Sequence, residues 1–378
     1  MRPLHVGLDL VFLEPASGGS GTYARELARA LRAVEPETRI TAWVGRDGPA
    51  TLEGVDELVR LPVRSTGSPV HVPVELFWVG LDARRRGADL VHGLAYTSPV
   101  VAPGVATLVT ILDLTWHHCP EAATWLARRM FGLLSPLCGC TADRVIAISQ
   151  TARDDLVATL GLDAAKIEVT PLGVADRPLV VPAGAGDLRA RLGLGADAPV
   201  LLSVAQMSPH KNLTMLVEAL PRLADQRAVV VVPGRRTPYS EKLEARAAAL
   251  GVRDRLVLPG YVDEETLEGL YATAAAFVLP SLLEGFGLPV LEAMRRGVAV
   301  ACSDTSALPE VAGGAALLFD PRSADAVAAA CDRLLADTAE RERLIAAGRG
   351  RAAELTWEKT ARATLRAYRR ALAARVVA

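Results

Sequence analysis

Residues 280–294 read Pro280-Ser-Leu-Leu-Glu284-Gly-Phe-Gly287-Leu-Pro289-Val-Leu-Glu292-Ala-Met294. They follow an apolar run, residues 275–279, that predicts a buried strand, and they lead into residues with helical spacing. A strand, a glycine-containing loop and the start of a helix are therefore predicted here. Pro289 suits the first turn of that helix, because the N–H that proline lacks would have no partner there. Gly285 and Gly287 allow the backbone to approach a bound group closely.

This loop combines two kinds of group that a sugar nucleotide requires. Backbone N–H groups at the start of a helix form a binding site for an anion such as a phosphate. Glu284 stands at the entrance of the loop and Glu292 one turn into the helix, where both carboxylates can accept hydrogen bonds from hydroxyl groups. A plain turn with two solvated glutamates is the other interpretation of such a pattern.

The same stretch resembles the signature of the retaining glycosyltransferases of family 4, which have the GT-B architecture. The spacing from Glu284 to Glu292, both glycines, the proline and the final Glu-Ala-Met all agree with it. The resemblance implies an α/β fold with two Rossmann-like domains that face each other across a cleft, and a C-terminal helix that returns to the N-terminal domain. We expect an acceptor-binding domain over residues 1–180, a nucleotide-sugar-binding domain over 181–360 and the returning helix over 361–378.

Length and composition agree with a soluble two-domain α/β protein. A chain of 378 residues is too long for one ordinary core. Lysine and arginine number 42 and aspartate and glutamate 43, so the chain carries no excess of charge for binding nucleic acid. Five cysteines, an odd number without CxxC spacing, argue against a disulfide framework and a zinc site. With no leader-like start and no apolar run of about 18 residues, we expect a cytoplasmic protein.

Strand and helix patterns alternate twice along the chain, as in parallel sheets with crossover helices. The first set has predicted strands at 4–10, 40–44, 90–92, 106–111, 144–148 and 167–169, with helices at 22–33, 122–137 and 150–160. A segment rich in proline, glycine and alanine, from 171 to about 198, predicts a linker. The second set has strands at 199–205, 228–232, 256–258 and 275–279, with helices at 213–224, 240–250, 264–273, 324–336, 339–348 and 357–374.

A second glycine-rich stretch, residues 17–22, precedes the first predicted helix. It does not fit the dinucleotide-binding fingerprint, because Ala24 occupies the position of the third glycine. A tight turn without a ligand is one interpretation. By the family resemblance, this loop closes over the donor diphosphate, and Gly19 and Gly21 supply the backbone N–H groups.

The segment after the predicted strand at 106–111 is similar to the family's His-Asp-Leu…Pro-Glu segment, where the histidine lies near the donor sugar and the acceptor. Asp113 matches that pattern, but Leu112 stands where the histidine is usual. The imidazole is either absent, or His117 or His118 supplies it from further along the loop. Asp113 is the stronger candidate, because an adjacent histidine pair in a loop is more often ordinary surface.

In the second half, Lys211 and Asn212 match the family's Pro-x-Lys-Asn segment, in which the lysine contacts the donor diphosphate. Gln206 stands where many members have arginine, so a second cation has to come from elsewhere. Arg235 is the candidate for it, although the Arg235-Arg236 pair could equally be a solvated turn. Val262 lies in a segment similar to the one whose backbone meets the nucleobase.

The resemblance implies transfer of a mannose- or glucose-type hexosyl group from a nucleotide diphosphate sugar to a hydroxyl, with retention, in the synthesis of a glycan, glycolipid or secondary metabolite. The departing diphosphate gains negative charge. This charge would be stabilised by Lys211, by the backbone from Gly285 through Phe286 and Gly287 to Leu288, and by the first glycine loop. Glu284 would hold the sugar and Glu292 the ribose. No metal and no further cofactor is expected.

Three questions stay open at the level of sequence. A degenerate sugar-nucleotide-binding protein and a GT-B sugar-nucleotide epimerase are the alternatives, and retention of Lys211, Glu284 and Glu292 argues against the first. The acceptor, whether glycan, lipid-linked or a small molecule, is expected to meet loops at 63–73 and 116–137. Basic and bulky apolar residues over 125–134 could rest on a membrane or pack inward.

Overall fold

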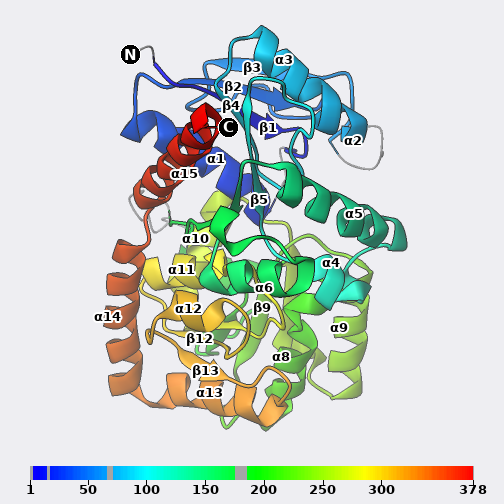
Figure 1. The fold of residues 1–378 in the computed structure, drawn as a ribbon. Coiled ribbons are helices and arrows are strands. Elements are labelled where there is room, and N and C mark those ends of the chain that lie inside the picture. The colour runs from blue at the N-terminus through cyan, green and yellow to red at the C-terminus, as the bar shows by residue number, and fades with distance from the viewer. Residues whose placement is uncertain (1–2, 15–17, 66–70, 175–184, 378) are drawn as a thin grey trace. The chain divides into compact units, whose positions relative to one another are not determined.

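The computed structural model describes residues 3–14, 18–65, 71–174 and 185–377, in two compact units. The first unit comprises Met1–Ala175 and Leu355–Ala378, and the second comprises Asp176–Glu354. The expected domain boundary at residues 180 and 181 lies outside the described residues, as does part of the predicted linker. Each unit is built on a parallel β-sheet with helices packed against it, which confirms the predicted α/β class of two Rossmann-like domains (Figure 1).

The first unit has a parallel sheet with the strand order β3-β2-β1-β4-β5-β6-β7. Continuous apolar runs form its buried central strands, as expected for a sheet covered on both faces. The strand that the sequence did not predict, β3, is short, lies at the edge and is only half-buried. The strands are β1 (His5–Leu10), β2 (Arg39–Val44), β3 (Glu57–Arg60), β4 (Leu90–Gly93), β5 (Ala106–Ile111), β6 (Arg144–Ala147) and β7 (Ile167–Val169).

The three helices predicted in the first unit are present, two of them with shifted ends, and further helices lie where none was predicted. The first helix begins at Gly19 rather than at residue 22, and the second spans Trp125–Thr141 rather than residues 122–137. Residues 71–85 and 115–118 form helix, so parts of the loops expected to meet the acceptor are helical, and residues 66–70 of the first of these loops lie outside the described residues. The helices are α1 (Gly19–Val34), α2 (His71–Pro73), the π-helix η1 (Val74–Trp78), α3 (Val79–Arg85), α4 (Thr115–His118), η2 (Pro120–Ala122), α5 (Trp125–Thr141), α6 (Gln150–Leu160), η3 (Ala164–Lys166) and α15 (Trp357–Val377).

The C-terminal helix α15 packs on the first unit, where it lies along α1, and this confirms the predicted return of the chain (Figure 1). A buried hydrogen-bond network joins it to the sheet. The hydroxyl of Tyr368 lies 2.9 Å from Nδ1 of His92, and Nε2 of the same ring lies 2.8 Å from the Thr110 hydroxyl. Burial lowers the pKa of His92 to about 3, so the imidazole is neutral. The helix is therefore part of the core of this unit.

The second unit has a parallel sheet with the order β10-β9-β8-β11-β12-β13. Its strands are β8 (Val200–Leu202), β9 (Val229–Pro233), β10 (Leu256–Gly260), β11 (Ala276–Leu279), β12 (Val300–Ser303) and β13 (Leu317–Phe319). Its helices are α7 (Ala185–Arg191), η4 (Pro209–Lys211), α8 (Leu213–Ala219), η5 (Leu220–Arg222), α9 (Pro238–Ala249), η6 (Arg253–Arg255), α10 (Glu264–Thr273), α11 (Leu288–Arg295), α12 (Leu308–Ala312), α13 (Ala324–Ala336) and α14 (Thr338–Glu354). Helix α7 lies within the segment predicted as a linker, and β12 and β13 were not predicted.

The strand order fixes where a ligand can bind in this unit. The chain runs outward from β8 through β9 to β10, then returns to place β11 on the other side of β8. Neighbouring loops after β8 and β11 therefore diverge at the carboxyl edge of the sheet, and this switch point is where open α/β sheets bind ligands. The first unit has the corresponding point between β1 and β4.

Two general features bear on the environment of the protein. Within the residues that the structure describes, no helix is both long enough and apolar enough to cross a membrane. All five cysteines are free thiols, and Cys140 is the exposed one.

Candidate functional site

An ion pair between two loops occupies the switch point of the second unit. Lys211 ends the short helix η4 after β8, and Glu284 lies in the loop after β11. The ammonium nitrogen of Lys211 lies 2.8 Å from both carboxylate oxygens of Glu284. The side chains are only 17% and 9% exposed, so water screens this pair less than a surface pair. The structure thus brings together two residues that are 73 positions apart in the sequence.

Two serines fix the carboxylate of Glu284 and its backbone. The hydroxyl of Ser281, itself fully buried, donates to Oε1 of Glu284 at 2.7 Å. The backbone N–H of Glu284 donates to the Ser306 hydroxyl at 2.9 Å, and Ser306 has a left-handed backbone with φ of 54°. The position of this carboxylate is therefore set by residues from two loops before any ligand binds.

Asn212 and a backbone hydrogen bond join the two loops. The Asn212 side-chain amide donates to the carbonyls of Pro280 and Pro321, at 3.0 and 2.7 Å. The backbone N–H of Leu282 donates to the carbonyl of His210 at 2.8 Å. These bonds couple the Lys211 loop to the Glu284 loop, so the ion pair belongs to one connected structure.

Helix α11 begins directly after the Glu284 loop. Gly287 has φ of 109°, and a Cβ at this residue would lie 2.6 Å from Cδ2 of Leu308, so both the conformation and the space require glycine. Pro289 is the second residue of the helix, as predicted. No carbonyl among the described residues accepts a hydrogen bond from the backbone N–H of Phe286, Gly287 or Leu288. These amides are available to an anion.

Glu292 lies one turn into α11, beside an aromatic ring and a guanidinium. The hydroxyl of Tyr271 donates to Oε2 of Glu292 at 3.4 Å, and the guanidinium of Arg296 lies over the Tyr271 ring at 4.4 Å from its centroid. Burial raises the pKa of Glu292 above its usual value, although the charge of Arg296 opposes this. Arg296 is itself paired with Glu268. The Glu292 carboxylate is thus supported from one side by a fixed cluster.

The remaining predicted donor-binding residues of this unit lie at the same edge of the sheet but outside the ion pair. Gln206 follows β8 and is exposed. Arg235 follows β9, is exposed, and forms no ion pair with another described residue. Its neighbour Arg236 is paired with Glu244. Val262 follows β10 and is half-buried. Parallel strands place all these loops at one carboxyl edge, which is the arrangement of a ligand-binding site.

In the first unit, the glycine-rich stretch forms the first turn of α1. Ser17 lies outside the described residues, and Gly18 is the residue before the helix. Gly19 is exposed and Gly21 is buried. Both belong to the helix rather than to a separate loop, and this helix start follows β1 at the switch point of the unit. The backbone N–H groups of a first helical turn are again donors for an anion.

Asp113 is held by its own surroundings after β5. Its Oδ1 accepts a hydrogen bond from the Tyr96 hydroxyl at 3.1 Å and from the backbone N–H of Thr115 at 2.9 Å, which starts α4. Burial raises the pKa of Tyr96 well above its usual value, and the charge of Asp113 adds to this. Leu112, at the position where the family has histidine, is buried in the core at 8% exposed. That position therefore offers neither an imidazole nor an exposed side chain.

The two candidate histidines differ in what they contact. Nε2 of His118 lies 2.9 Å from Oδ1 of Asp155 on α6, and the His118 side chain is 37% exposed. His117 is exposed, with its ring edge against Trp116 and His118 at centroid distances of 5.7 and 5.0 Å. A catalytic role for either residue stays a prediction.

Several groups near the two switch points were not found from the sequence. Ser281 lies three residues before Glu284, a local spacing that could have suggested its hydrogen bond, whereas Ser306 gave no signal. Asp9 is the second-last residue of β1 and is buried at 2% exposed, and its Oδ2 has no hydrogen-bond partner among the described residues. Burial raises the pKa of Asp9 to about 7, and the pKa of the nearby buried Glu75 lies well above its usual value because of burial and the charge of Asp9.

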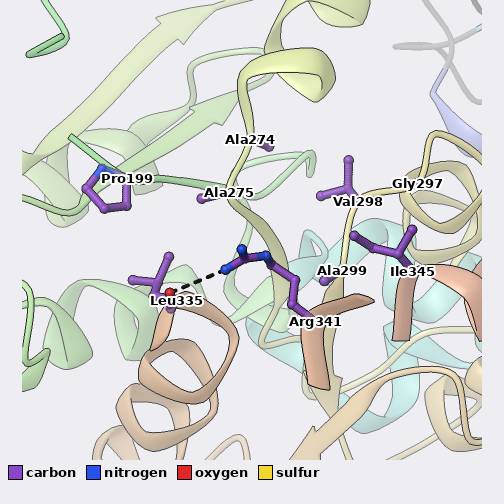
Figure 2. A pocket seen from close by; sticks show the side chains of 9 residues that line it. All are labelled: Pro199, Ala274, Ala275, Gly297, Val298, Ala299, Leu335, Arg341 and Ile345. Atoms are coloured by element: carbon purple, nitrogen blue, oxygen red, sulfur yellow. Dashed lines mark hydrogen bonds between the residues drawn. The ribbon is translucent and has the colours of Figure 1, made fainter. Parts of the chain in front are cut away.

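A cavity of about 390 Å³ lies away from these residues, at the opposite edge of the second sheet (Figure 2). Residues at the amino ends of β8, β11 and β12 line it, together with Arg341, whose guanidinium donates to the carbonyls of Leu334 and Leu335. Ligands of open α/β sheets bind at the carboxyl edge, so we do not assign the function to this cavity. Among the described side chains, no group of three or more His, Cys, Asp or Glu is placed to hold a metal ion.

Two family models match the chain, one over each unit. Residues 17–177 match the model described as Glycosyltransferase Family 4, and residues 186–351 match the model described as Glycosyl transferases group 1. The two matches together extend over both glycine-rich loops, Asp113, Lys211 and the stretch from Glu284 to Glu292.

Individual proteins resemble the chain over most of its length. A D-inositol 3-phosphate glycosyltransferase of Frankia alni is 34% identical over 96% of this chain and 97% of that protein. O-antigen chain mannosyltransferase B of Escherichia coli is 32% identical over 69% of this chain and 70% of that protein. A sucrose-phosphate synthase from Thermosynechococcus elongatus has a similar structure, with a TM-score of 0.79 and 25% identity over 98% of this chain and all of that chain.

Proposed function

The chain belongs to the family 4 glycosyltransferases, and we propose that it moves a hexosyl group from a nucleotide diphosphate sugar to a hydroxyl acceptor. The mannosyltransferase among its relatives supports a donor of the mannose type, and the family resemblance also implies glucose as a donor sugar. Retention of configuration at the anomeric carbon is the stereochemistry that the family resemblance implies. The fold agrees with a glycosyltransferase of this family, because the sucrose-phosphate synthase has the same architecture.

The observation that carries the proposal is the ion pair at the switch point of the second unit. Lys211 supplies a point charge for a phosphate, and Glu284 supplies acceptors for sugar hydroxyls. The two groups lie 2.8 Å apart, at the place where open α/β sheets bind ligands. Because the two groups are so close, a phosphate bound by Lys211 and a sugar ring bound by Glu284 would be neighbours. A sugar nucleotide carries both in one molecule.

The chemical difficulty of the reaction is the charge that develops as the glycosidic bond breaks. The sugar becomes oxocarbenium-like, while the departing diphosphate gains negative charge. We assign the diphosphate to Lys211 and to the backbone N–H groups of residues 286–288. A carboxylate accepts about four hydrogen bonds, so Glu284, which already accepts two from Lys211 and one from Ser281, keeps about one for a sugar hydroxyl. Donors that are fixed before the reaction need no reorganisation in the transition state.

The nucleoside would lie beside Glu292 and the loops after β8, β9 and β10. Glu292 accepts hydrogen bonds from ribose hydroxyls, and the bond from Tyr271 orients its carboxylate. Arg235, exposed at the same edge, is our candidate for the second cation that Gln206 does not provide. The backbone at Val262 would meet the nucleobase.

For the first unit we propose a phosphate contact and a hydroxyl contact. The N–H groups of Gly19 and Gly21, in the first turn of α1, are suited to a phosphate oxygen. Asp113 has a second carboxylate oxygen, Oδ2, that can accept from a sugar hydroxyl while Oδ1 stays bonded to Tyr96 and Thr115. The acceptor itself, whether a glycan, a lipid-linked sugar or a small molecule, presents the attacking hydroxyl.

We expect the reaction to proceed without a metal ion. Lys211 and the helix-start amides supply the positive potential that a divalent cation gives to a diphosphate leaving group in other transferases. Turnover in the presence of a chelator is therefore the expected behaviour, and loss of turnover with chelator would contradict this part of the proposal.

The experiment that tests the proposed function is donor hydrolysis by the purified protein. Mannose, glucose, galactose and N-acetylglucosamine are offered on GDP, UDP, ADP and dTDP, with chelator and without acceptor, and the release of nucleotide is measured. We expect one nucleotide to be released above all others. NMR of the product formed with a hydroxyl acceptor then reports whether the anomeric configuration is retained.

Each outcome of this experiment bears on a different part of the proposal. No release of any nucleotide, together with no thermal stabilisation by any of them, would favour a degenerate binding protein. Leu112 and Gln206 would then be the substitutions to explain. Release of a nucleotide together with an inverted product would overturn retention and keep the transferase.

A further inference from the structure

Exposed apolar side chains gather on one part of the first unit. Among the described residues, ten large hydrophobic side chains are exposed, and eight of them belong to η1, α3, α5 or the loop before β5. These eight are Phe77, Trp78, Leu81, Val101, Trp125, Leu126, Leu133 and Leu137. We name these residues, together with the four arginines described below, the α3–α5 surface. The other two, Tyr261 and Leu318, are separate residues of the second unit.

Three elements of the α3–α5 surface meet around Leu76 of η1. Leu76 of η1 belongs to the same buried cluster as Leu134 and Cys138 of α5. The backbone N–H of Val101 donates to the carbonyl of Leu76 at 3.2 Å. η1, the loop before β5 and α5 therefore meet at Leu76, and α3 continues directly from η1.

Helix α5 shows how the region is built. Trp125, Arg129, Leu133 and Leu137 are spaced four residues apart, so they follow one side of the helix. Trp125 and Leu133 are 67% and 69% exposed, whereas Leu134 on the inner side is buried. The helix is thus apolar on both sides, and no described residue covers the apolar side chains on its outer side.

The charges of the region have one sign. The exposed charged residues of η1, α3 and α5 are Arg84, Arg85, Arg128 and Arg129, and none of them forms an ion pair with a described residue. The acidic residues of the same elements, Glu75 and Asp82, are buried. The guanidinium of Arg129 lies over the Trp125 ring, 5.5 Å from its centroid.

We propose that the α3–α5 surface binds to an anionic lipid bilayer. Tryptophan and phenylalanine are favoured at the membrane interface, leucines insert between acyl chains, and arginines attract anionic headgroups. A second copy of the chain is a poorer occupant, because a two-fold contact through this surface would bring the same four arginines together. Exposed apolar side chains, together with arginines that form no ion pair with a described residue, fit the interface between lipid and water.

Binding to lipid would place the first unit at the surface where a lipid-borne acceptor is found. Among the acceptor classes considered above, it favours a lipid-linked one. This consequence rests on the proposed function, whereas the binding itself does not, so the two can fail separately.

The test is sedimentation of the full chain with lipid vesicles. One set of vesicles is phosphatidylcholine alone and the other is phosphatidylcholine mixed with phosphatidylglycerol. We expect the protein to partition at least about tenfold more strongly onto the anionic vesicles. The double variants W125S/L133S and R128Q/R129Q should each weaken this partition at least about tenfold.

Matched controls separate this surface from general effects. Leu318→Ser removes an exposed leucine of the second unit, and R322Q/R366Q removes two exposed arginines that lie outside the surface and have no ion pair with a described residue. Both controls should sediment as the unchanged protein does. Thermal unfolding of all variants checks that they are folded, which is expected because the substituted side chains are exposed.

Three results would overturn the proposal. The unchanged protein could stay in the supernatant with both kinds of vesicle, or both double variants could bind anionic vesicles as strongly as the unchanged protein. Analytical ultracentrifugation could also show a dimer that dissociates in W125S/L133S, which would make the region an interface between copies. Donor hydrolysis in the absence of vesicles is measured separately, so failure of the transferase function is not confused with failure to bind lipid.

Discussion

At the carboxyl edge of the second unit's sheet, Lys211 and Glu284 lie 2.8 Å apart, and a serine and an asparagine hold their two loops. At the same edge of the first unit, Asp113 contacts Tyr96 and Thr115, and His118 contacts Asp155 on another helix. Among the described residues, no hydrogen bond or ion pair joins Asp113, His117 and His118 to one another. The second unit thus holds two opposite charges in a fixed arrangement, whereas each candidate side chain of the first unit is bonded only to residues that are not candidates.

This difference has a physical cause. In the second unit both loops leave neighbouring strands at the switch point, so their side chains converge. In the first unit, Asp113 follows β5, whereas the glycines at the start of α1 follow β1, and β4 lies between these two strands. We therefore expect substitutions in the second unit to change chemistry most, and those in the first to have smaller or structural effects.

The largest expected effect is on the ion pair. Lys211→Ala and Glu284→Ala should each lower kcat by about a hundredfold or more, because each removes an electrostatic contact to the transition state. Donor hydrolysis by the purified variants measures this. Arg333→Ala is the matched control, since it breaks an ion pair with Glu340 that lies on α13 and α14. Unchanged turnover in both alanine variants would show that the Lys211–Glu284 pair is not part of the active site, and the comparison of the two units would then fail.

The sequence predicted most of the fold because long apolar runs and helical spacing are local signals. Strand β5, helix α6 and helix α13 have the predicted bounds. The missed strands β3, β12 and β13 have three or four residues each, too few for a clear alternation, and β3 and β13 are edge strands that are partly exposed. Their position depends on the strand beside them, which sequence patterns do not show.

The candidate site was predictable only in part. Glu284 was found from its own loop and Lys211 through the family resemblance, but their ion pair was not predicted, because nothing local connects two residues so far apart in the chain. Ser306 holds the loop through a left-handed backbone that is unusual for serine, and no residue pattern predicts it. The start of α1 at Gly19 was missed because glycine is a poor helix former, and tertiary packing overrides that preference here.

Matched glycine substitutions in the two units sharpen the comparison. Gly287→Ala should lower the free energy of unfolding by about 2 to 3 kcal/mol, because alanine is strained at φ of 109° and its Cβ would meet Leu308. Gly19→Ala should not destabilise the protein, since nothing lies within 4 Å of the added Cβ and the residue is in a helix. Chemical denaturation measures both. Equal destabilisation by the two substitutions would contradict the prediction that only Gly287 requires glycine.

A pH effect is expected in the first unit because of Asp9. An unfolded aspartate has a pKa of about 4, and burial raises that of Asp9 to about 7. Between these values the unfolded chain has released the proton while the folded chain keeps it, so the free energy of unfolding falls as pH rises. Below about pH 4 both states are protonated and the effect vanishes. Asp9→Asn should lack this fall, so its stability relative to the unchanged protein should increase from about pH 4 to about pH 7.

Tryptophan fluorescence measures this effect in the first unit alone, since Trp43, Trp78, Trp116, Trp125 and Trp357 all belong to it. Denaturation curves of both proteins are recorded at several pH values and compared as differences, which cancels the titration of groups that do not interact with Asp9. The titration of Glu75, whose pKa the charge of Asp9 helps to raise, stays part of the measured difference. Asp47→Asn is the control, because this carboxyl has a lowered pKa through its hydrogen bonds with Ser65 and should show the opposite trend at low pH. A stability difference for Asp9→Asn that does not change with pH would contradict the prediction.

The smallest expected effects belong to the two histidines that follow Asp113. His117→Ala and His118→Ala should each change kcat by less than about threefold, because both side chains are exposed and His118 is paired with Asp155 at the surface. The loss of such a surface pair costs at most about 1 kcal/mol of stability, so both variants should stay folded. A histidine acting as general acid or base would instead contribute about a hundredfold or more. Donor hydrolysis and transfer to an acceptor both have to be measured, since a base for the acceptor hydroxyl would affect only the second. A hundredfold loss in transfer for one histidine, with hydrolysis unchanged, would mean that it replaces the imidazole absent at Leu112. The first unit would then contribute chemistry of its own, and the contrast with the second unit would fail at that residue.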